Sequence, residues 1–400
     1  MENCNSFTCP ICGNTNIRYI GTRNGKPYCR KCITFRGQEA MDDYRICDKA
    51  DYKLEYELTK EQSVLSDQLV DNYRHGINSL VHAVCGSGKT EIVLEIISFV
   101  IKQGKRVGFV VPRRDVVKEL HQRFASIFTN NNVIALYGGH VNRLEGDLVC
   151  LTSHQLFRYE KYFDLLIMDE IDAFPYEGND VLQAMFHRAI KGHYIMMSAT
   201  PSKNVINSFK QKGKAILTLY SRFHGHPLPV PTIKISHGIM KYYHLVKVLR
   251  GFYQQNKPVF VFTPTIDICE QTYNVLRFLF KQISYVHSKC DDRSKRIEDF
   301  RKGLIKTLVT TAVLERGVTV KDLQVIVFKS DHSIYTSQSL IQISGRAGRK
   351  KEAPEGEVIF IAGKKTNEMA VCVSEIETAN KSLQTVFQKN KRIWLSIFVS

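Results

Sequence analysis

The stretch AVCGSGKT, residues 83–90, constrains the fold of this chain more than any other part of the sequence. It matches the phosphate-binding loop pattern GxxxxGK[ST], except that Ala83 stands where the first glycine is expected. The apolar run SLVHAV before it predicts a strand, and EIVLEIISFV after it predicts a helix. This is the context that such a loop requires, because backbone N–H groups at a helix start can hold phosphate oxygens.

Short apolar runs alternate with helical patterns on both sides of this loop. The runs RVGFVVP, VIALYGG, DLVCLTS, DLLIMDE and YIMMSAT predict strands, as do PVFVFTP, ISYVHS, KTLVTTA, LQVIVFKS and EVIFIAG further on. Near-continuous apolar strands separated by helices favour parallel sheets covered on both faces. The proline-rich stretch RFHGHPLPVPT, residues 222–232, is typical of a short stiff linker. We therefore expect an α/β protein with domains at residues 1–48, 49–224 and 225–400.

Length, charge and apolar runs limit the class of protein. Four hundred residues suit two or three domains. The net charge of +17 favours a polyanionic partner, either nucleic acid or an anionic membrane surface, although a solvated basic surface would give the same value. No apolar run approaches the roughly 18 residues that span a bilayer, and the N-terminus does not resemble a signal peptide. We therefore expect a cytoplasmic protein, in which paired cysteines bind metal.

Two CxxC pairs near the N-terminus predict a zinc site. Cys9 and Cys12 form the first pair, Cys29 and Cys32 the second, and sixteen residues separate them. Zn²⁺ takes four thiolates at tetrahedral positions, and each CxxC turn presents two sulfur atoms to one ion. Metal would supply the stability that so small a segment lacks. The segment could contact DNA, contact a partner protein or cap the next domain, and the sequence leaves these alternatives open.

The other cysteines are not expected to bind the metal. Cys4 and Cys47 lie near the pairs, but they fall outside the CxxC spacing. The remaining five are scattered through the sequence and are interpreted as packing residues: Cys85, Cys150, Cys269, Cys290 and Cys372.

The phosphate loop and an acidic strand end together predict a site for ATP and Mg²⁺. The backbone of Gly86, Ser87, Gly88, Lys89 and Thr90 is expected to cradle phosphates. Lys89 would reach the β- and γ-phosphates, and Thr90 would hold Mg²⁺. In DLLIMDEID, four apolar residues lead into Asp169 and Glu170 at the carboxyl end of a strand, where ligands bind in open α/β sheets. Asp169 would bind Mg²⁺, and Glu170 would polarise the attacking water.

Two further motifs extend this site. YIMMSATPS ends a strand in Ser198-Ala199-Thr200, and QISGRAGR places Arg346 and Arg349 three residues apart. Arginines from a second domain can stabilise the charge that develops on the γ-phosphate. The aromatic segment after DEID, Phe174 to Tyr176, is expected to close a hydrophobic corner; the alternative is that it packs against the SAT loop and transmits the nucleotide state.

In this order, the motifs resemble those of superfamily-2 helicases and translocases. AVCGSGKT resembles their phosphate loop, which often begins with alanine, and DEID, SAT and QISGRAGR resemble their later motifs. TTAVLERGVT, residues 310–319, resembles the motif before the arginines, and Arg316 is a further candidate there. YELTKEQ resembles the adenine-reading element, with Gln62 as its glutamine. The resemblance implies two RecA-like parallel-sheet domains that hydrolyse ATP between them.

A narrower resemblance is to the ComFA family of competence ATPases. A four-cysteine segment precedes a helicase core containing VPRRDVVKEL, LTSHQLFRY, DEIDAFPY and LERGVT. The resemblance implies an ATP-driven translocase or helicase on single-stranded DNA that drives DNA uptake in natural transformation. It also implies work at the inner face of the membrane uptake channel, with a ComFC-type protein and a recombination mediator as partners, and it allows an oligomer.

Strand ends of both domains supply candidates for nucleic-acid contact. Small polar residues and amides at such ends suit phosphate contacts that ignore base sequence. The candidates are Arg113, Arg114, Thr152, Thr263, Thr310 and Thr311.

Three alternative functions compete with the DNA-uptake translocase. A DEAD-box-type RNA helicase shares the core motifs. A PriA-like replication-restart helicase is a near relative, but its usual zinc insertion lies within the second lobe. A non-catalytic zinc adaptor with a vestigial motor is disfavoured because Lys89, Asp169, Glu170 and both arginines are intact.

Overall fold

The structure is a computed structural model that describes residues 7–41, 43–54, 56–311, 320–350 and 352–397, with side chains up to residue 383. The chain divides into two compact units. The first comprises Met1–Ala83 and Gly88–Leu219, and the second comprises Val84–Ser87 and Tyr220–Ser400. Cys4, Arg316 and most of TTAVLERGVT lie outside the described residues.

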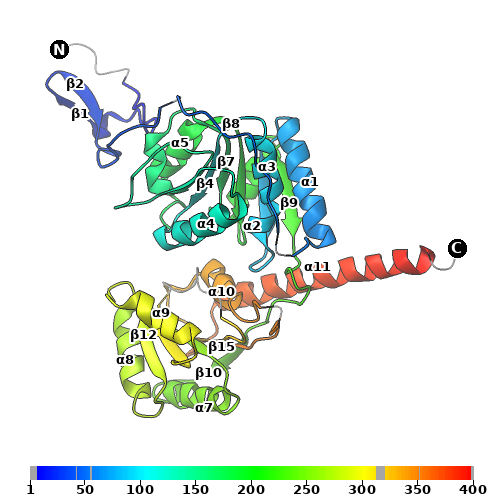
Figure 1. Ribbon diagram of the computed structural model, residues 1–400. Helices are drawn as coiled ribbons and strands as arrows, with labels where there is room; N and C mark the ends of the chain where they lie inside the picture. Colours follow the sequence, from blue (N-terminus) through cyan, green and yellow to red (C-terminus); the bar gives the residue numbers. More distant parts are fainter. Residues whose placement is uncertain (1–6, 42, 55, 312–319, 351, 398–400) are drawn as a thin grey trace. The chain divides into compact units, whose positions relative to one another are not determined.

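The first unit is built on a seven-stranded, all-parallel sheet in the order β5-β6-β4-β7-β8-β3-β9 (Figure 1). The order is not sequential, so the chain crosses over repeatedly, and most of the crossovers contain a helix. The strands are β3 (Ser79–Ala83), β4 (Val107–Val111), β5 (Val133–Leu136), β6 (Leu148–Thr152), β7 (Phe163–Met168), β8 (Ile190–Ser198) and β9 (Ala215–Leu219).

Alternating apolar residues along these strands build two cores. In β4, Phe109 and Val111 belong to one core and Val110 to the other, because successive side chains of a strand point to opposite faces. The first core includes side chains of α1 (Lys60–Arg74), α2 (Lys89–Ile92), α3 (Leu94–Ile101) and α4 (Arg114–Ile127). The second includes side chains of η3 (Ser153–Arg158), α5 (Asp180–Ala189) and α6 (Lys203–Gln211).

The N-terminal segment forms a small hairpin. A short 3-10 turn, η2 (Ile17–Tyr19), leads into β1 (Ile20–Arg23), which pairs antiparallel with β2 (Lys26–Cys29). The connecting Asn24 and Gly25 both have positive φ, 51° and 73°, as a two-residue asparagine–glycine hairpin turn requires. The segment therefore folds locally around the CxxC pairs.

The second unit repeats the parallel architecture with six strands in the order β10-β15-β14-β11-β13-β12. The strands are β10 (Thr232–Ile235), β11 (Val259–Phe262), β12 (Ile283–Val286), β13 (Thr307–Thr310), β14 (Gln324–Phe328) and β15 (Val358–Ala362). The helices are α7 (Met240–Gln254), α8 (Ile266–Leu276), α9 (Arg293–Arg301), α10 (Ser337–Ser344) and α11 (Asn367–Ile397). Every apolar run that predicted a strand in this half of the chain forms one.

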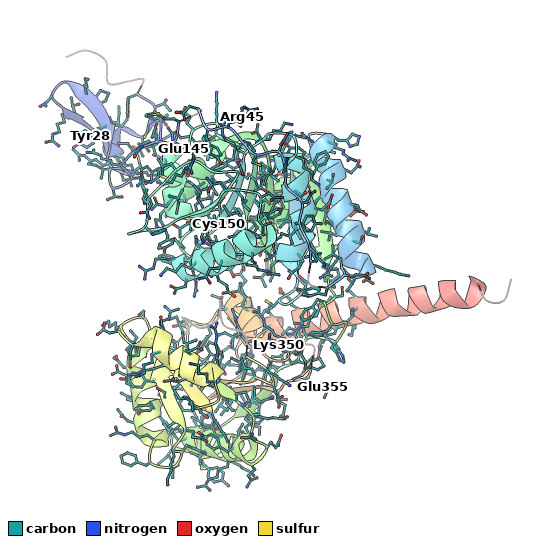
Figure 2. The ribbon with its side chains drawn as sticks, in the orientation of Figure 1. Tyr28, Arg45, Glu145, Cys150, Lys350 and Glu355 are labelled. Atoms are coloured by element: carbon teal, nitrogen blue, oxygen red, sulfur yellow. The ribbon has the colours of Figure 1, made fainter. Side chains whose placement is uncertain are left out.

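Most of the scattered cysteines are packing residues, as predicted. Cys150, labelled in Figure 2, is 1% exposed on β6, and Cys269 and Cys372 are fully buried in the second unit. Cys85 is also buried, whereas Cys290 is partly exposed. None of the helices in the described part of the chain combines the length and apolarity that a membrane crossing needs.

Candidate nucleotide, nucleic-acid and metal sites

The phosphate loop lies between the end of β3 at Ala83 and the start of α2 at Lys89. Gly86 and Gly88 have φ of +81° and +78°, a left-handed conformation that glycine adopts without steric cost. The Lys89 ammonium donates to the Ala83 carbonyl oxygen at 3.4 Å and so folds back over the loop. Ala83 itself is fully buried in the sheet core, which explains why a small side chain suits this position.

Gln62 lies close to the phosphate loop. It is 1% exposed, and its side-chain oxygen accepts a hydrogen bond from the Thr59 N–H at 2.9 Å in a capping box at the start of α1. A Cβ added at Gly88 would lie 2.5 Å from the Gln62 amide nitrogen, so the loop and this side chain are in close contact. The cap fixes the orientation of the predicted adenine-reading glutamine.

Asp169 and Glu170 follow β7 directly. The Asp169 N–H donates to the Val110 carbonyl at 2.9 Å, which continues the pairing of β7 with β4. Glu170 has a φ of +58°, and its N–H donates to an Asp169 carboxylate oxygen at 2.8 Å. Since β7, β8 and β3 are neighbours in a parallel sheet, their carboxyl ends bring Asp169, Glu170 and the end of the SAT strand to the edge where the phosphate loop begins.

Asp172 joins the DEID and SAT motifs, a role that the sequence analysis did not assign. Its carboxylate accepts a hydrogen bond from the Thr200 hydroxyl at 2.6 Å. The Thr200 N–H in turn donates to the Ser198 hydroxyl at 2.9 Å. The sequence offered a signal for this contact, because Asp172 is the last residue of the DEID motif. Its partner Thr200 could be identified only from the structure, in which β7 pairs with β8.

A buried charge pair supports the helix that follows the phosphate loop. Glu91 is 7% exposed, pairs with the Arg123 guanidinium from α4, and accepts a hydrogen bond from the Tyr56 hydroxyl at 2.6 Å. Burial opposes ionisation of Glu91, but the Arg123 charge and the Tyr56 hydroxyl outweigh it and hold the pKa of Glu91 below its ordinary value. The pair ties α2 to α4 next to the predicted ATP site.

The aromatic segment after DEID only partly forms the predicted hydrophobic corner. Tyr176 is 4% exposed and packs edge-on against Phe186. Phe174, however, is 86% exposed, so the prediction is wrong for this residue.

In the second unit, both predicted arginines lie just after α10. Gly345 ends the helix, and its N–H donates to the Ile341 carbonyl at 2.9 Å. Arg346 is 3% exposed and Arg349 is half-buried. The Arg349 Nε donates to the Gly345 carbonyl at 3.2 Å, so this side chain returns to the helix end.

The candidate nucleic-acid residues of the first unit lie at neighbouring strand ends. Thr152 is the last residue of β6 and pairs in register with Val111 of β4. Arg113 and Arg114 follow β4, with Arg114 exposed at the start of α4. The structure thus brings the two arginines and Thr152 to one edge of the sheet, although Thr152 is only 6% exposed.

In the second unit, Thr263 and Thr310 are fully buried. The hydroxyl of Thr263 donates to the Thr310 carbonyl at 3.1 Å, and that of Thr310 donates to the Val286 carbonyl at 2.8 Å. These hydroxyls link the ends of β11, β13 and β12 to one another. In this arrangement a side-chain contact with nucleic acid would have to come from neighbours such as Thr311, which is half-buried.

The four cysteines of the CxxC pairs come together as predicted. Their sulfur atoms all lie within 4.8 Å of one another. The Cys9 and Cys32 sulfurs are 3.4 Å apart, and those of Cys12 and Cys29 are 3.7 Å apart. Four thiolates about 2.3 Å from a tetrahedral zinc ion are separated by about 3.8 Å, so this donor set fits Zn²⁺. In the part of the chain that the structure describes, Cys47 is not a member of the cluster.

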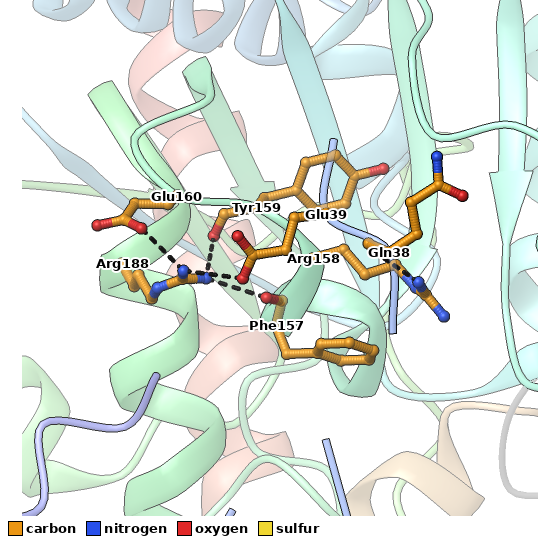
Figure 3. Close-up of polar contacts among 7 residues, drawn as sticks. All are labelled: Gln38, Glu39, Phe157, Arg158, Tyr159, Glu160 and Arg188. Atoms are coloured by element: carbon orange, nitrogen blue, oxygen red, sulfur yellow. Dashed lines mark hydrogen bonds and ion pairs between the residues drawn. The ribbon is translucent and has the colours of Figure 1, made fainter. Parts of the chain in front are cut away.

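Arg188 anchors the cysteine-bearing segment to the first unit (Figure 3). It lies near the end of α5 and donates to the carbonyl oxygens of Phe157 and Tyr159 at 2.9 and 3.0 Å. The same guanidinium forms ion pairs with Glu39 at 3.1 Å and Glu160 at 2.9 Å. One side chain therefore connects the helix, the segment after η3 and the N-terminal segment.

Further contacts place this segment beside the end of β6. Arg158 donates to the Gln38 carbonyl at 2.7 Å, as Figure 3 shows, and its own carbonyl accepts from the Ala40 N–H at 2.9 Å. The Phe35 ring stacks on His154, with ring centroids 6.0 Å apart. The described residues of the segment therefore pack against the first unit, and its contact with DNA or with a partner protein stays a prediction.

Comparisons with known proteins identify the family. The model described as type III restriction enzyme, res subunit matches residues 55–203, and that of the helicase conserved C-terminal domain matches residues 240–351. Competence protein ComFA of Bacillus subtilis (strain 168) is 32% identical over 94% of this chain and 86% of its own length. The chain belongs to the ComFA family. ComFA of Streptococcus pneumoniae (strain ATCC BAA-255 / R6) is 30% identical over 93% of this chain and 90% of its length.

More distant similarities support the helicase fold of this ComFA family member. ATP-dependent DNA helicase RecG of Aquifex aeolicus (strain VF5) is 27% identical over 78% of this chain, but over only 42% of RecG. S. cerevisiae Dbp5 bound to RNA and ADP BeF3 has a TM-score of 0.62 at 17% identity, covering 80% of this chain and 91% of Dbp5. DEAD-box helicase Mss116 bound to ssRNA and UDP-BeF has a TM-score of 0.63 at 17% identity, covering 81% of this chain and 78% of Mss116.

The two parallel-sheet units are thus RecA-like domains, as predicted. The protein is an ATP-dependent helicase or translocase whose ATPase activity depends on nucleic acid. ATP and Mg²⁺ are the substrate and cofactor that this ATPase fold implies.

Proposed function

We propose that this protein is a single-stranded DNA translocase that drives DNA uptake during natural competence. The observation that supports this best is its similarity to two proteins named competence protein ComFA over more than nine-tenths of its own length. The strongly basic composition, +17 at pH 7, fits a nucleic-acid substrate. Work at the cytoplasmic face of the membrane, with a ComFC-type protein and a recombination mediator as partners, is part of the same proposal.

The residues at the strand ends suit the steps of ATP hydrolysis. Lys89 binds the β- and γ-phosphates, and Thr90 with Asp169 holds Mg²⁺ in the proposed cycle. Glu170 orients the attacking water, and its backbone is fixed by the hydrogen bond to Asp169 at 2.8 Å. Arg346 and Arg349 supply positive charge to the γ-phosphate as it leaves. Hydrolysis and product release then change the affinity of the protein for the DNA strand.

Cys9, Cys12, Cys29 and Cys32 would hold Zn²⁺, and the bound ion would stabilise the fold in which the N-terminal segment packs against the first unit. Metal analysis of the purified full-length protein should give one zinc per chain, and Cys29→Ser should bind far less. A wild-type protein purified without zinc that keeps the same resistance to proteolysis between residues 7 and 40 would contradict this structural role.

ATP hydrolysis with matched nucleic acids tests the proposed substrate. The ATPase activity of the full-length protein is measured without nucleic acid, with a single-stranded DNA oligonucleotide, with duplex DNA of that sequence and with RNA of that sequence. All four assays use one salt concentration. We expect the single-stranded DNA to stimulate hydrolysis most, and Lys89→Ala to abolish it. Equal or stronger stimulation by RNA would indicate RNA remodelling instead, the activity that the DEAD-box fold also supports.

A further inference from the structure

We propose that Arg222 is a positioning residue for the loop that carries Arg346 and Arg349. Arg222 is the first residue of the stretch interpreted as a linker, yet its side chain is 1% exposed. Its guanidinium donates to the carbonyl oxygens of Gly345, Ala347 and Gly348, at 3.1, 2.9 and 2.7 Å. Among the described residues, no carboxylate pairs with this guanidinium. Its Nε also donates to the Cys85 carbonyl at 3.4 Å, so all four of its acceptors are backbone carbonyls, and three of them belong to the loop after α10.

The loop needs donors because it follows a helix end. The last carbonyl groups of a helix have no intrahelical partner, and a positive charge there is favoured by the helix dipole. Gly345 is the residue at the end of α10, and the two other carbonyls follow within three residues. Arg222 presents several N–H groups in a fixed planar arrangement, which lysine cannot reproduce.

The same turn is tightly constrained at Gly348. This residue has a φ of +63°, and a Cβ there would lie 2.2 Å from the Pro354 carbonyl oxygen. The His224 Nε2 lies 3.0 Å from the Gly348 carbonyl as well. Burial and the neighbouring Arg222 charge lower the pKa of His224 to about 4, so this imidazole is neutral at pH 7 and donates its Nε2–H to the carbonyl. Two side chains of the linker stretch thus hold one carbonyl.

A shared acceptor connects Arg222 to Arg349. The Gly345 carbonyl accepts hydrogen bonds from both guanidinium groups, from Arg222 Nη2 at 3.1 Å and from Arg349 Nε at 3.2 Å. Burial lowers the pKa of Arg222 to about 10, and the Arg349 charge contributes to the lowering. The pKa shift is consistent with two cations held close together by common backbone contacts.

Arg222 therefore fixes the backbone from which both arginines project. This inference rests on the proposed role of Arg346 and Arg349 at the γ-phosphate. It predicts an effect on kcat rather than on ATP binding, because the arginines act on the charge that develops during hydrolysis.

A double-mutant cycle in the full-length protein tests this inference. With saturating nucleic acid, Arg222→Met should lower kcat for ATP by about tenfold or more, with KM for ATP within about twofold, since small misplacements of catalytic groups are costly. Arg222→Lys should fall between the wild type and Arg222→Met. Because both changes act through one loop, adding Arg222→Met to Arg349→Ala should cause little further loss of kcat.

The control is Arg106→Met, which removes a similarly buried arginine from the first unit, where it donates to the Tyr44 carbonyl at 3.1 Å. The fold-loss of kcat caused by Arg106→Met should multiply with the fold-loss caused by Arg349→Ala, even if Arg106→Met also lowers stability. Losses that also multiply for Arg222→Met, or a kcat within twofold of the wild type, would overturn the inference. If Arg349→Ala keeps the wild-type kcat, Arg349 does not have the role proposed for it. The same double-mutant cycle, made with Arg346→Ala in place of Arg349→Ala, would then test whether Arg222 positions Arg346.

Discussion

At the residue scale, short polar contacts connect the ends of neighbouring strands. The Thr200 hydroxyl and the Asp172 carboxylate, 2.6 Å apart, join the segments that follow β8 and β7. A hydrogen bond to a charged acceptor is worth about 1.5–3 kcal/mol. We therefore expect the SAT segment to follow a movement of the acidic segment, which contains Asp169 and Glu170.

Thr200→Val should separate ATP hydrolysis from movement on DNA. It keeps the shape of the side chain but removes the hydroxyl that reaches Asp172. We expect DNA-stimulated ATP hydrolysis to fall by about threefold or less and translocation per ATP to fall by at least tenfold, since the direct contact between the motifs is lost. Thr200→Ser, which keeps the hydroxyl, is the matched control. Equal losses of both activities in Thr200→Val would show that the contact has no coupling role.

The charge pair of Glu91 and Arg123 should give the first unit a specific pH dependence. The folded pKa of Glu91 lies below its ordinary value of 4.5, so its ionised form stabilises the wild type above that pH and the contribution is lost as pH falls further. Arg123→Met leaves the buried carboxyl without its cation. We expect a loss of about 1–3 kcal/mol at pH 7, allowing for the partial exposure of Arg123.

Without Arg123, burial should raise the pKa of Glu91 above its unfolded value, so the variant gains stability as pH falls. The difference in unfolding free energy between wild type and Arg123→Met should therefore shrink from pH 8 to pH 5, measured by urea denaturation and circular dichroism. The Glu91→Gln/Arg123→Met variant should not show this trend. A difference that is constant with pH would disprove the assignment.

Sequence motifs predicted the residues with local signatures and missed those that depend on distant partners. Lys89, Asp169 and the four cysteines could be predicted because each lies in a short motif with a fixed spacing. Arg222 was assigned to a linker on the basis of its proline-rich surroundings. Its partners are more than a hundred residues away in the sequence, and no local pattern shows that a loop after α10 needs a donor.

At the scale of elements, apolar runs predicted most strands because a parallel strand is buried on both faces. The strands β9 and β10 were not recognised. β9 is only partly buried on an edge, and β10 begins where the proline-rich stretch ends. The single helix predicted after the phosphate loop is divided into α2 and α3 at Val93.

Docking of the N-terminal segment depends on the contacts of Arg188. Arg188→Ala removes donors from the carbonyls of Phe157 and Tyr159, two largely buried residues. We expect a loss of about 2–3 kcal/mol, since buried acceptors without donors are costly, and faster proteolysis near residues 33–41. Lys191→Ala is the control, because Lys191 is half exposed and its ion pair with Asp164, at 3.8 Å, should contribute under about 0.5 kcal/mol. Similar behaviour of the two variants would argue against this anchor.

At the scale of the whole molecule, the account requires that ATP hydrolysis moves the protein along single-stranded DNA. In each RecA-like unit some strands end in or are followed by polar or basic residues, such as Thr152 and Arg113 in the first unit and Thr310 in the second, and the chain carries a large positive charge. Phosphate contacts of this kind do not depend on base sequence, which a translocase requires. They also weaken as the salt concentration rises. A binding measurement does not distinguish a protein that moves along DNA from one that only binds it, so movement along the DNA has to be measured.

The most direct test is displacement of streptavidin from single-stranded DNA biotinylated at either end. We predict ATP-dependent displacement from one end only, absent with Lys89→Ala and absent on the matched RNA. Hydrolysis stimulated by DNA without displacement from either end would contradict the account, because it would show an ATPase that binds single strands but does not move along them.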